Sequence, residues 1–365
     1  MPKTFSAAAL TRQVTGVADL ASAAQQSELP LAQVEIDMAQ PRRAMPTALR
    51  RLWPGISPAG FFTTWLARAR EEAPEAVDGW ERALYPLPAG SAPDDGAAMP
   101  DLARAPYARS WLSLVGLAAD IHTVGLQQRI AVYQTGVDSY RLLFGERRLL
   151  AFHLLEWVGV GDYSRIPAFV VDGFDALAQA LENGSRADLN AIERARQLAL
   201  LLFALNPEEA PPRGAGQPGW DWYAQAADAK RFRIPRGKAD LVARALGLGS
   251  RQHISLYRQL LEISAGVAEI AEMLNWPEGK LRSLIKASAE KGQQLLTLAR
   301  IEAGLEQPQI NEEERRRERV YRFVERVYRI AQIELPSEID AHSKPDVLDA
   351  IREAREHLDE LERQL

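Results

Sequence analysis

The stretch "YRLLFGERRLLAFHLL", residues 140–155, decides the fold, because a strand pattern there runs directly into a helix pattern. Three charged residues, Glu146 to Arg148, stand at the junction. A helix N-terminus offers free N–H groups and a partial positive charge, and arginines add forked donors suited to phosphate oxygens. Two interpretations are open from this stretch alone: a phosphate cradle, or a solvated first helical turn with surface ion pairs.

Length and composition set broad limits. The 365 residues suggest two or three domains, and 47% hydrophobic with 25% charged residues is the range of an ordinary soluble globular protein. No apolar run reaches the ~18 residues of a membrane helix, and the N-terminus lacks a secretory pattern. The absence of cysteine excludes disulfides and thiolate chemistry, and the five histidines lack metal-ligand spacing. We therefore expect a cytoplasmic protein without a membrane partner.

Charge is distributed unevenly along the chain. The net charge is −5, which alone argues against nucleic acid. Residues 229–300, however, hold 13 lysines and arginines against six acidic residues, so the rest of the chain is acidic. One basic module in an acidic chain is the local footprint that phosphate binding requires.

The N-terminal half mixes strand and helix patterns. Residues 1–30 are interpreted as an N-terminal arm, "LAQVEID" (31–37) as a strand and "QPRR" (40–43) as a turn. Residues 44–110 are interpreted as a surface insertion with a small aromatic core, including a helix that begins near Pro58. A helix ending at Gly125, a hairpin over 129–144 and a strand over 166–172 follow.

A helix, a break and a second helix are predicted over 174–205. The break falls at Asn183-Gly184-Ser185, and Asp188 or Asn190 is expected to cap the second helix. Around the break, "ENGSR" places a carboxylate, Glu182, beside the amide of Asn183, a pair that suits Mg²⁺. The alternative is an ordinary helix end with a surface arginine, Arg186.

The remainder of the chain is predicted to be helical. Residues 206–228 are interpreted as a linker, 229–305 as a DNA-binding domain and 306–365 as C-terminal helices with a short a/d seam for self-association or packing. "LVARALGLGSRQHISLYRQLLEI" has helix-turn-helix spacing. The second helix should present Ser250, Arg251, Gln252 and Ser255 to base edges. Phosphate contacts are expected from Arg244, Arg258, Lys280 and Arg282. A plain helical bundle with a solvated surface is the alternative.

Taken in order, these motifs resemble the ParB family of DNA-partition proteins. The matching segments are Gln40-Pro41-Arg42, Gly125 to Gln128, Gly145 to Arg148, Ile166-Pro167, Glu182 to Arg186 and Asp188 to Glu193, ahead of the helix-turn-helix pattern. The resemblance implies an α+β CTP-binding domain over 31–205, followed by an all-α helix-turn-helix domain.

The resemblance also implies site residues. Gly145, Glu146, Arg147 and Arg148 would hold the triphosphate, with Arg186 near the phosphates and Glu182 and Asn183 near Mg²⁺. Gln40 and Arg42 would lie close to the nucleotide, with Gln40 a candidate for positioning water in slow CTP hydrolysis. Gly125 and Gln128 would line the base side.

Three departures from the family pattern concern turnover and the insertion. Arg129 replaces the usual proline, Leu150 stands where the family often has an arginine, and 85 positions separate Gln40 from Gly125. The insertion is expected to reshape the clamp gate or to recruit a partner.

The leading functional hypothesis is a dimeric, CTP-regulated clamp on a centromere-like DNA site, associated with nucleoid or plasmid and working with a ParA-like ATPase. A site-specific transcriptional regulator on the same scaffold is the alternative. A ParB-like nuclease ranks last, because no carboxylates cluster with Glu182.

Overall fold

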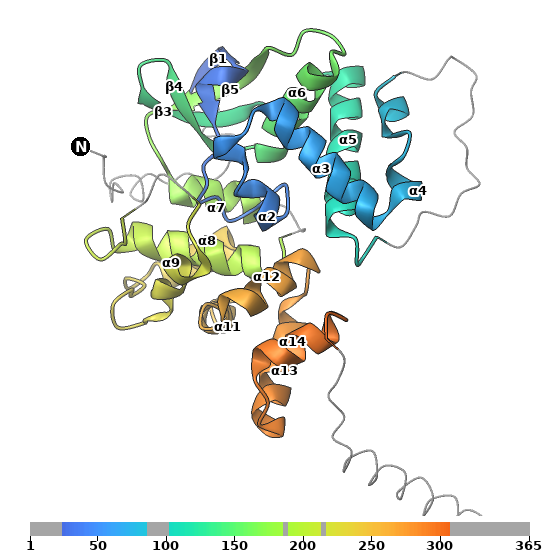
Figure 1. Ribbon diagram of the computed structural model, residues 1–365. Helices are drawn as coiled ribbons and strands as arrows, with labels where there is room; N and C mark the ends of the chain where they lie inside the picture. The colour runs from blue at the N-terminus through green and yellow to red at the C-terminus, as the bar shows by residue number, and fades with distance from the viewer. Residues whose placement is uncertain (1–23, 86–101, 185–188, 213–216, 307–365) are drawn as a thin grey trace, which may run out of the picture. The chain divides into compact units, whose positions relative to one another are not determined.

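A mixed five-stranded sheet lies at the centre of the N-terminal part, with strand order β1-β5-β3-β4-β2 (Figure 1). The computed structural model describes residues 24–85, 102–184, 189–212 and 217–306. The strands are β1 (Gln25–Pro30), β2 (Val34–Glu35), β3 (Ile130–Gly136), β4 (Ser139–Phe144) and β5 (Arg165–Val171). β3 pairs antiparallel with β4 and parallel with β5, β1 is antiparallel to β5, and β2 is parallel to β4. The predicted hairpin and the strand near 166–172 are therefore present.

β3 is apolar along its first half because both faces of the sheet are covered. Ile130 and Val132 belong to one hydrophobic core, whereas Ala131 and Tyr133 belong to a smaller cluster on the other face. Side chains alternate across a strand, so a strand buried on both faces loses its polar alternation.

The sheet begins earlier than the sequence predicts. Residues 25–30, assigned to an N-terminal arm, form β1, whereas the strand expected over 31–37 reduces to Val34–Glu35 after a 3₁₀ turn, η2 (Leu31–Gln33). β1 is an edge strand in which Leu29 is buried, and its sequence lacks apolar alternation. Pairing with β5, a long-range interaction, therefore determines its structure.

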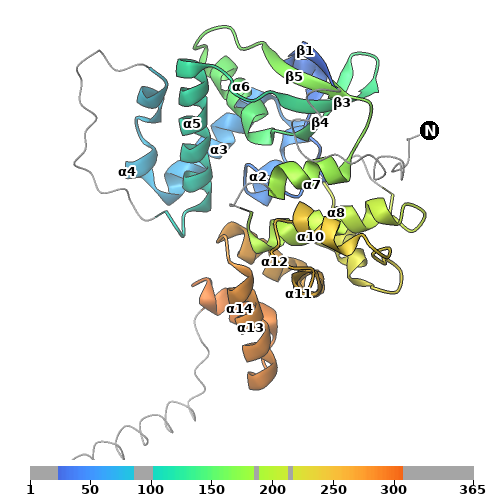
Figure 2. The ribbon, with the colours of Figure 1, turned by 180° about the vertical axis from the view of Figure 1, so that it is seen from behind.

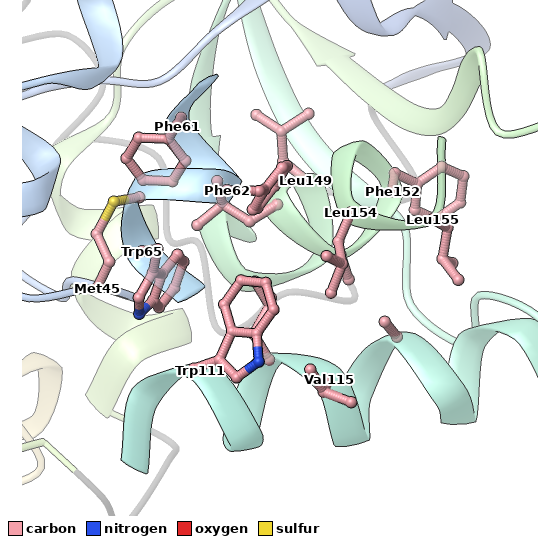
Figure 3. Packing of buried hydrophobic residues seen from close by; sticks show 14 of the residues in the cluster. Met45, Phe61, Phe62, Trp65, Trp111, Val115, Leu149, Phe152, Leu154 and Leu155 are labelled. Carbon is pink, nitrogen blue, oxygen red and sulfur yellow. The ribbon is translucent and has the colours of Figure 1, made fainter. Parts of the chain in front are cut away.

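The segment 44–110 is helical and joins the main core. It contains α2 (Thr47–Arg50), η3 (Trp53–Gly55), α3 (Pro58–Glu72), α4 (Pro74–Val77), η4 (Trp80–Leu84) and the start of α5 (Pro106–Val124). The predicted aromatic core is present: Trp65 and Trp111 are fully buried, with ring centroids 5.6 Å apart. Figure 3 shows Trp111 and Val115 of α5 facing residues of α6 (Glu146–Val158). The interpretation as a surface insertion is thus wrong, because these rings are continuous with the core under the sheet.

The helices after β5 share a second hydrophobic core. Figure 2 shows these helices gathered on one side of the sheet. These are α7 (Ala176–Gly184), α8 (Ala191–Leu205), α9 (Trp220–Ala224), η5 (Gln225–Ala227), α10 (Ala239–Ala245), α11 (His253–Leu260), α12 (Ala265–Met273), α13 (Glu278–Lys291) and α14 (Leu295–Glu302). Asn190 caps α8 in a reciprocal capping box with Glu193, as one of the two predicted alternatives. The helix pair α7–α8, assigned from sequence to the nucleotide domain, shares its apolar core with the helices that follow.

Side-chain contacts hold the described part of the segment that was predicted as a linker. Trp220 of α9 donates its indole N–H to the carbonyl oxygen of Ile263 at 2.8 Å, and the Tyr223 hydroxyl donates to that of Ala39 at 3.1 Å. Proline and glycine around α9 gave the linker pattern, but two buried aromatic residues anchor the segment. Residues 307–365, with the a/d seam, lie outside the described residues. No helix in the described ranges is both long and apolar enough to cross a bilayer.

Candidate functional site

Gly145 makes the junction between β4 and α6 sterically feasible. Its φ of +102° lies in the left-handed region, and a Cβ there would come 2.9 Å from Cγ2 of Ile130. Both constraints select glycine. No side chain caps the first turn of α6, so the helix N-terminus that the sequence singled out retains amide donors of the kind that bind anions.

Arg148 links three segments of the candidate site. Its guanidinium donates to the carbonyl oxygens of Gln128 at 2.9 Å and Arg129 at 2.7 Å, and lies 3.1 Å from the Glu182 carboxylate of α7. Arg148 and Glu182 are both buried. The structure thus brings together residues from three of the predicted motifs, which are far apart in sequence.

The Glu146 carboxylate binds the segment after the QPRR turn. Its carboxylate forms a buried ion pair with Arg50 of α2 and accepts the Ala44 N–H at 3.1 Å. Arg50 also donates to the carbonyl oxygen of Asp37 at 2.6 Å. Sequence reasoning missed Arg50, because nothing local marks an arginine on a short helix as the partner of a glutamate 96 positions away.

Gln40 is buried at the end of β4. Its side-chain amide donates to the carbonyl oxygens of Leu142 and Leu143, at 3.4 and 3.2 Å. Gln179 of α7 donates to the same Leu143 oxygen at 2.8 Å. The QPRR turn and α7 therefore meet at the strand end that leads into Gly145.

Other predicted residues lie apart from this cluster or carry different contacts. Arg147 donates to the backbone and hydroxyl oxygens of Ser113 on α5, at 3.0 and 2.8 Å. Asn183 donates to Gln197 on α8 at 2.8 Å. Gly125 ends α5, as predicted, and is exposed. Arg186 lies outside the described residues.

Leu150, noted as a departure from the family pattern, is fully buried in the core beneath the sheet. A basic side chain at this position would point into apolar packing. The absence of an arginine here therefore reflects how α6 packs in this protein.

A buried ionic cluster lies immediately beyond the QPRR turn. The Glu272 carboxylate of α12 accepts from Arg196 of α8, from the Thr47 hydroxyl at 2.7 Å and from Arg43, whose Nη1 lies 3.4 Å away. Burial opposes ionisation of Glu272, but Arg196 and Arg43 hold its pKa at about 2. Burial, with the nearby Arg196, lowers the pKa of Arg43 to about 10. No local sequence pattern indicates this cluster.

Glu193 adds a titratable group beside the cluster. Its carboxylate accepts the backbone N–H of Arg43 at 3.1 Å and that of Asn190 at 3.0 Å. Burial raises the pKa of Glu193 to about 7, although these hydrogen bonds oppose the shift. The capping box thus joins α8 to the QPRR turn.

The candidate metal residues supply two oxygen-bearing side chains. Glu182 and Asn183 are consecutive, buried residues of α7, and their side chains contact Arg148 of α6 and Gln197 of α8, respectively. The described ranges contain no group of three acidic or histidine residues suited to a metal. A carboxylate and an amide oxygen are ligand types that suit Mg²⁺. This ion commonly takes one or two protein ligands and completes its shell with water and phosphate oxygens.

The helices predicted to read DNA have the expected exposure. Arg251 and Gln252, just before α11, and Ser255 within it are exposed, whereas Ile254 and Leu260 of α11 are buried. The Ser250 hydroxyl accepts the Gln252 N–H at 3.1 Å.

The residues predicted to contact phosphate differ in their surroundings. Arg244 is exposed, but Arg258 donates to the carbonyl oxygens of Ala226 and Phe232. Lys280 lies 2.8 Å from Glu302, and Arg282 pairs with Glu278 within α13. The role of all four residues in DNA binding stays a prediction.

Comparison with known proteins supports the assignment made from the motifs. No protein-family model matches the chain. A curated relative, the nucleoid occlusion protein of Lysinibacillus sphaericus (strain C3-41), is 36% identical over 107 residues. That match covers 28% of this chain and 34% of the relative, so the chain spans about a third of the relative's length. The relative is a ParB-family protein. The chain resembles the ParB family, as its motifs predict.

Among solved structures, the C-terminally truncated chromosome-partitioning protein ParB from Caulobacter crescentus, complexed with CTP-gamma-S, was also matched. The identity is 18%, the match covers 76% of this chain and 97% of that one, and the TM-score is 0.20. A score this low does not establish a shared overall fold.

The ParB-like motifs divide into two groups in the structure. Gln40, Gly145, Arg148 and Glu182 lie around the start of α6 and the end of β4, together with Gln128. Glu146, Arg147 and Asn183 instead hold neighbouring segments through Arg50, Ser113 and Gln197. We refer to the first group as the nucleotide cluster.

Proposed function

We propose that this chain is a ParB-like, CTP-dependent DNA-binding partition protein that loads at a centromere-like site and closes around DNA. The observation that carries the proposal is the convergence of three ParB-like motifs on the uncapped N-terminus of α6. A helix start of this kind, with Arg148 beside it, suits a triphosphate.

Charge within the nucleotide cluster supports a nucleotide with a divalent cation. Arg148 and Glu182 neutralise each other in the structure. With Mg²⁺ bound, Glu182 and Asn183 would hold the cation, and Arg148 would direct its donors to phosphate oxygens. Mg²⁺ would offset the charge of the triphosphate in this buried site. Gln40 is the candidate for positioning water in hydrolysis.

DNA recognition is assigned to α10 and α11. The exposed Arg251, Gln252 and Ser255 and the half-buried Ser250 lie at the start of α11, in a part of the chain with seven excess positive charges. Arginine pairs well with guanine and glutamine with adenine in the major groove. A dimer and a ParA-like ATPase partner follow from the family resemblance and belong to the same proposal.

Binding of each of the four ribonucleoside triphosphates tests this function. The full chain should bind CTP selectively with Mg²⁺, and DNA fragments from around its own gene should stimulate turnover. Binding of none of the four would overturn the nucleotide assignment. A chain that stays on its DNA site equally with and without CTP would instead be a static transcriptional regulator.

A further inference from the structure

Glu272 connects the helices after α11 to the QPRR turn. It lies on α12, yet its carboxylate accepts from Thr47 at the start of α2 and from Arg43, the last residue of the QPRR sequence. Arg196 of α8 binds both of its carboxylate oxygens. A single side chain therefore joins three segments that are separated by more than 70 residues.

Burial makes this arrangement specific. The side chains of Arg43 and Arg196 are each 4% exposed and that of Glu272 is 11% exposed. Two buried guanidinium groups share one carboxylate, and removal of its charge would leave both poorly compensated in a medium that stabilises charge weakly. The position of Arg43 consequently depends on the Glu272 charge.

The QPRR turn is held at both ends. Toward its start, the Gln40 amide bonds to carbonyl oxygens at the end of β4. Toward its end, the Arg43 N–H bonds to Glu193 and its guanidinium to Glu272. A shift of Arg43 would move Gln40, which belongs to the nucleotide cluster, and Arg42, which the family resemblance implies is close to the nucleotide.

We propose that Glu272 is a positioning residue for the nucleotide site, acting through Arg43. The inference rests on the proposed function and extends it: the helical part of the chain, which carries the candidate DNA-reading residues, completes the nucleotide site through α12. Neither the motifs nor their spacing assign Glu272 any role.

The test compares Glu272→Gln with Glu269→Gln in the full chain. Glu269 lies one turn earlier on α12 and also pairs with an arginine of the 44–52 segment, Arg51, at 2.6 Å. Both side chains of that pair are about half exposed, so its loss should change the stability of the fold very little. Calorimetric titration with CTP and Mg²⁺ should show affinity at least tenfold weaker in Glu272→Gln and within twofold of wild type in Glu269→Gln.

A double-variant cycle with Arg43→Gln distinguishes positioning from a general structural effect. If Glu272 acts through Arg43, the double variant should bind CTP no more weakly than the weaker single variant. DNA binding without nucleotide should stay within twofold of wild type. Losses that multiply, or an equal loss of DNA binding, would overturn the positioning role.

Further outcomes separate this inference from the proposed function. A wild-type chain that binds no nucleotide overturns both, whereas wild-type binding with unchanged affinity in Glu272→Gln overturns this inference alone. Should Glu272→Gln fail to fold, Glu272→Asp carries the test, because it keeps the charge and shortens the reach. It should bind CTP at least threefold more weakly, and wild-type affinity in Glu272→Asp would contradict the proposal.

Discussion

The Arg148 guanidinium of α6 lies 3.1 Å from the Glu182 carboxylate of α7, and both side chains are buried. This pair places the GERR and ENGSR motifs in one site. Its energetic consequence is direct: removal of one partner of a buried pair leaves an uncompensated charge.

Arg148→Ala should abolish CTP binding and lower the free energy of unfolding by ~3 kcal/mol, because Glu182 and two backbone carbonyl groups lose their partner. Initial binding to the specific DNA site should survive. Titration calorimetry and urea denaturation would measure the first two effects. Arg68→Ala is the control, since Arg68 pairs with Glu71 on the exposed surface of α3. Equal CTP affinity in wild type and Arg148→Ala would refute the assignment of the cradle.

Gly145→Ala should destabilise the fold more than Gly159→Ala, at the opposite end of α6. Both glycines have positive φ, so both substitutions incur a backbone cost of about 1–2 kcal/mol. A Cβ at Gly145 would also meet Ile130 at 2.9 Å, whereas nothing lies within 4 Å at Gly159. We expect about 1 kcal/mol of additional loss, measured by chemical denaturation. Equal losses of stability in the two variants would contradict this expectation, because they would show that the Ile130 side chain moves aside without an energetic cost.

The pH dependence of stability should carry a contribution from Glu193. Its pKa rises from 4.5 to about 7 on folding, so the folded state binds the proton more tightly than the unfolded state. This contribution is fully present below pH 4.5 and is lost as pH rises through 7, with a slope of up to ~1.4 kcal/mol per pH unit. Unfolding measurements from pH 4.5 to 7 should show it in wild type.

Glu193→Gln provides the comparison for that slope. Burial lowers the pKa of His153 to about 4, which gives the opposite trend over part of the range. His153 is present in both proteins, so its effect cancels in the difference. Parallel stability curves for wild type and Glu193→Gln would contradict the assignment of a raised pKa to Glu193.

Arg251→Ala should weaken specific DNA binding by ~1–3 kcal/mol with little effect on stability, because Arg251 is exposed at the start of α11. Arg258→Ala should chiefly lower stability, because its guanidinium bridges to backbone oxygens of Ala226 and Phe232. Fluorescence anisotropy with specific and scrambled DNA would measure the first effect. A uniform, salt-like loss on both DNAs would make Arg251 a phosphate contact.

The helices whose ends are marked by glycine or capping residues could be predicted from the sequence. Gly145 marks the start of α6, Gly125 ends α5, and Asn190 with Glu193 forms the capping box of α8. Each of these residues determines where a helix begins or ends within a few positions of its own place in the sequence. The order of the motifs then predicted the resemblance to the ParB family.

The buried ion pairs, β1 and the place of segment 44–110 could not be predicted, because they depend on contacts between residues far apart in the sequence. Arg50, Arg196 and Glu272 occupy ordinary helical positions, and their ion pairs span 76 to 229 residues of sequence. β1 lacks apolar alternation because Leu29 is its only buried residue, and the fully buried Trp65 joins the main core although its segment resembles an insertion. A charged or aromatic residue does not identify its partner across such distances.

The central claim is a CTP-dependent clamp on DNA, and retention on DNA tests it most directly. The full chain would be loaded with CTP and Mg²⁺ on a fragment carrying its specific site, with the fragment ends either open or blocked, and washed at raised salt. We predict retention on the blocked fragment that requires CTP and is lost when an end is opened by restriction cleavage. Retention that is the same with open and blocked ends, or the same without CTP, would contradict the account.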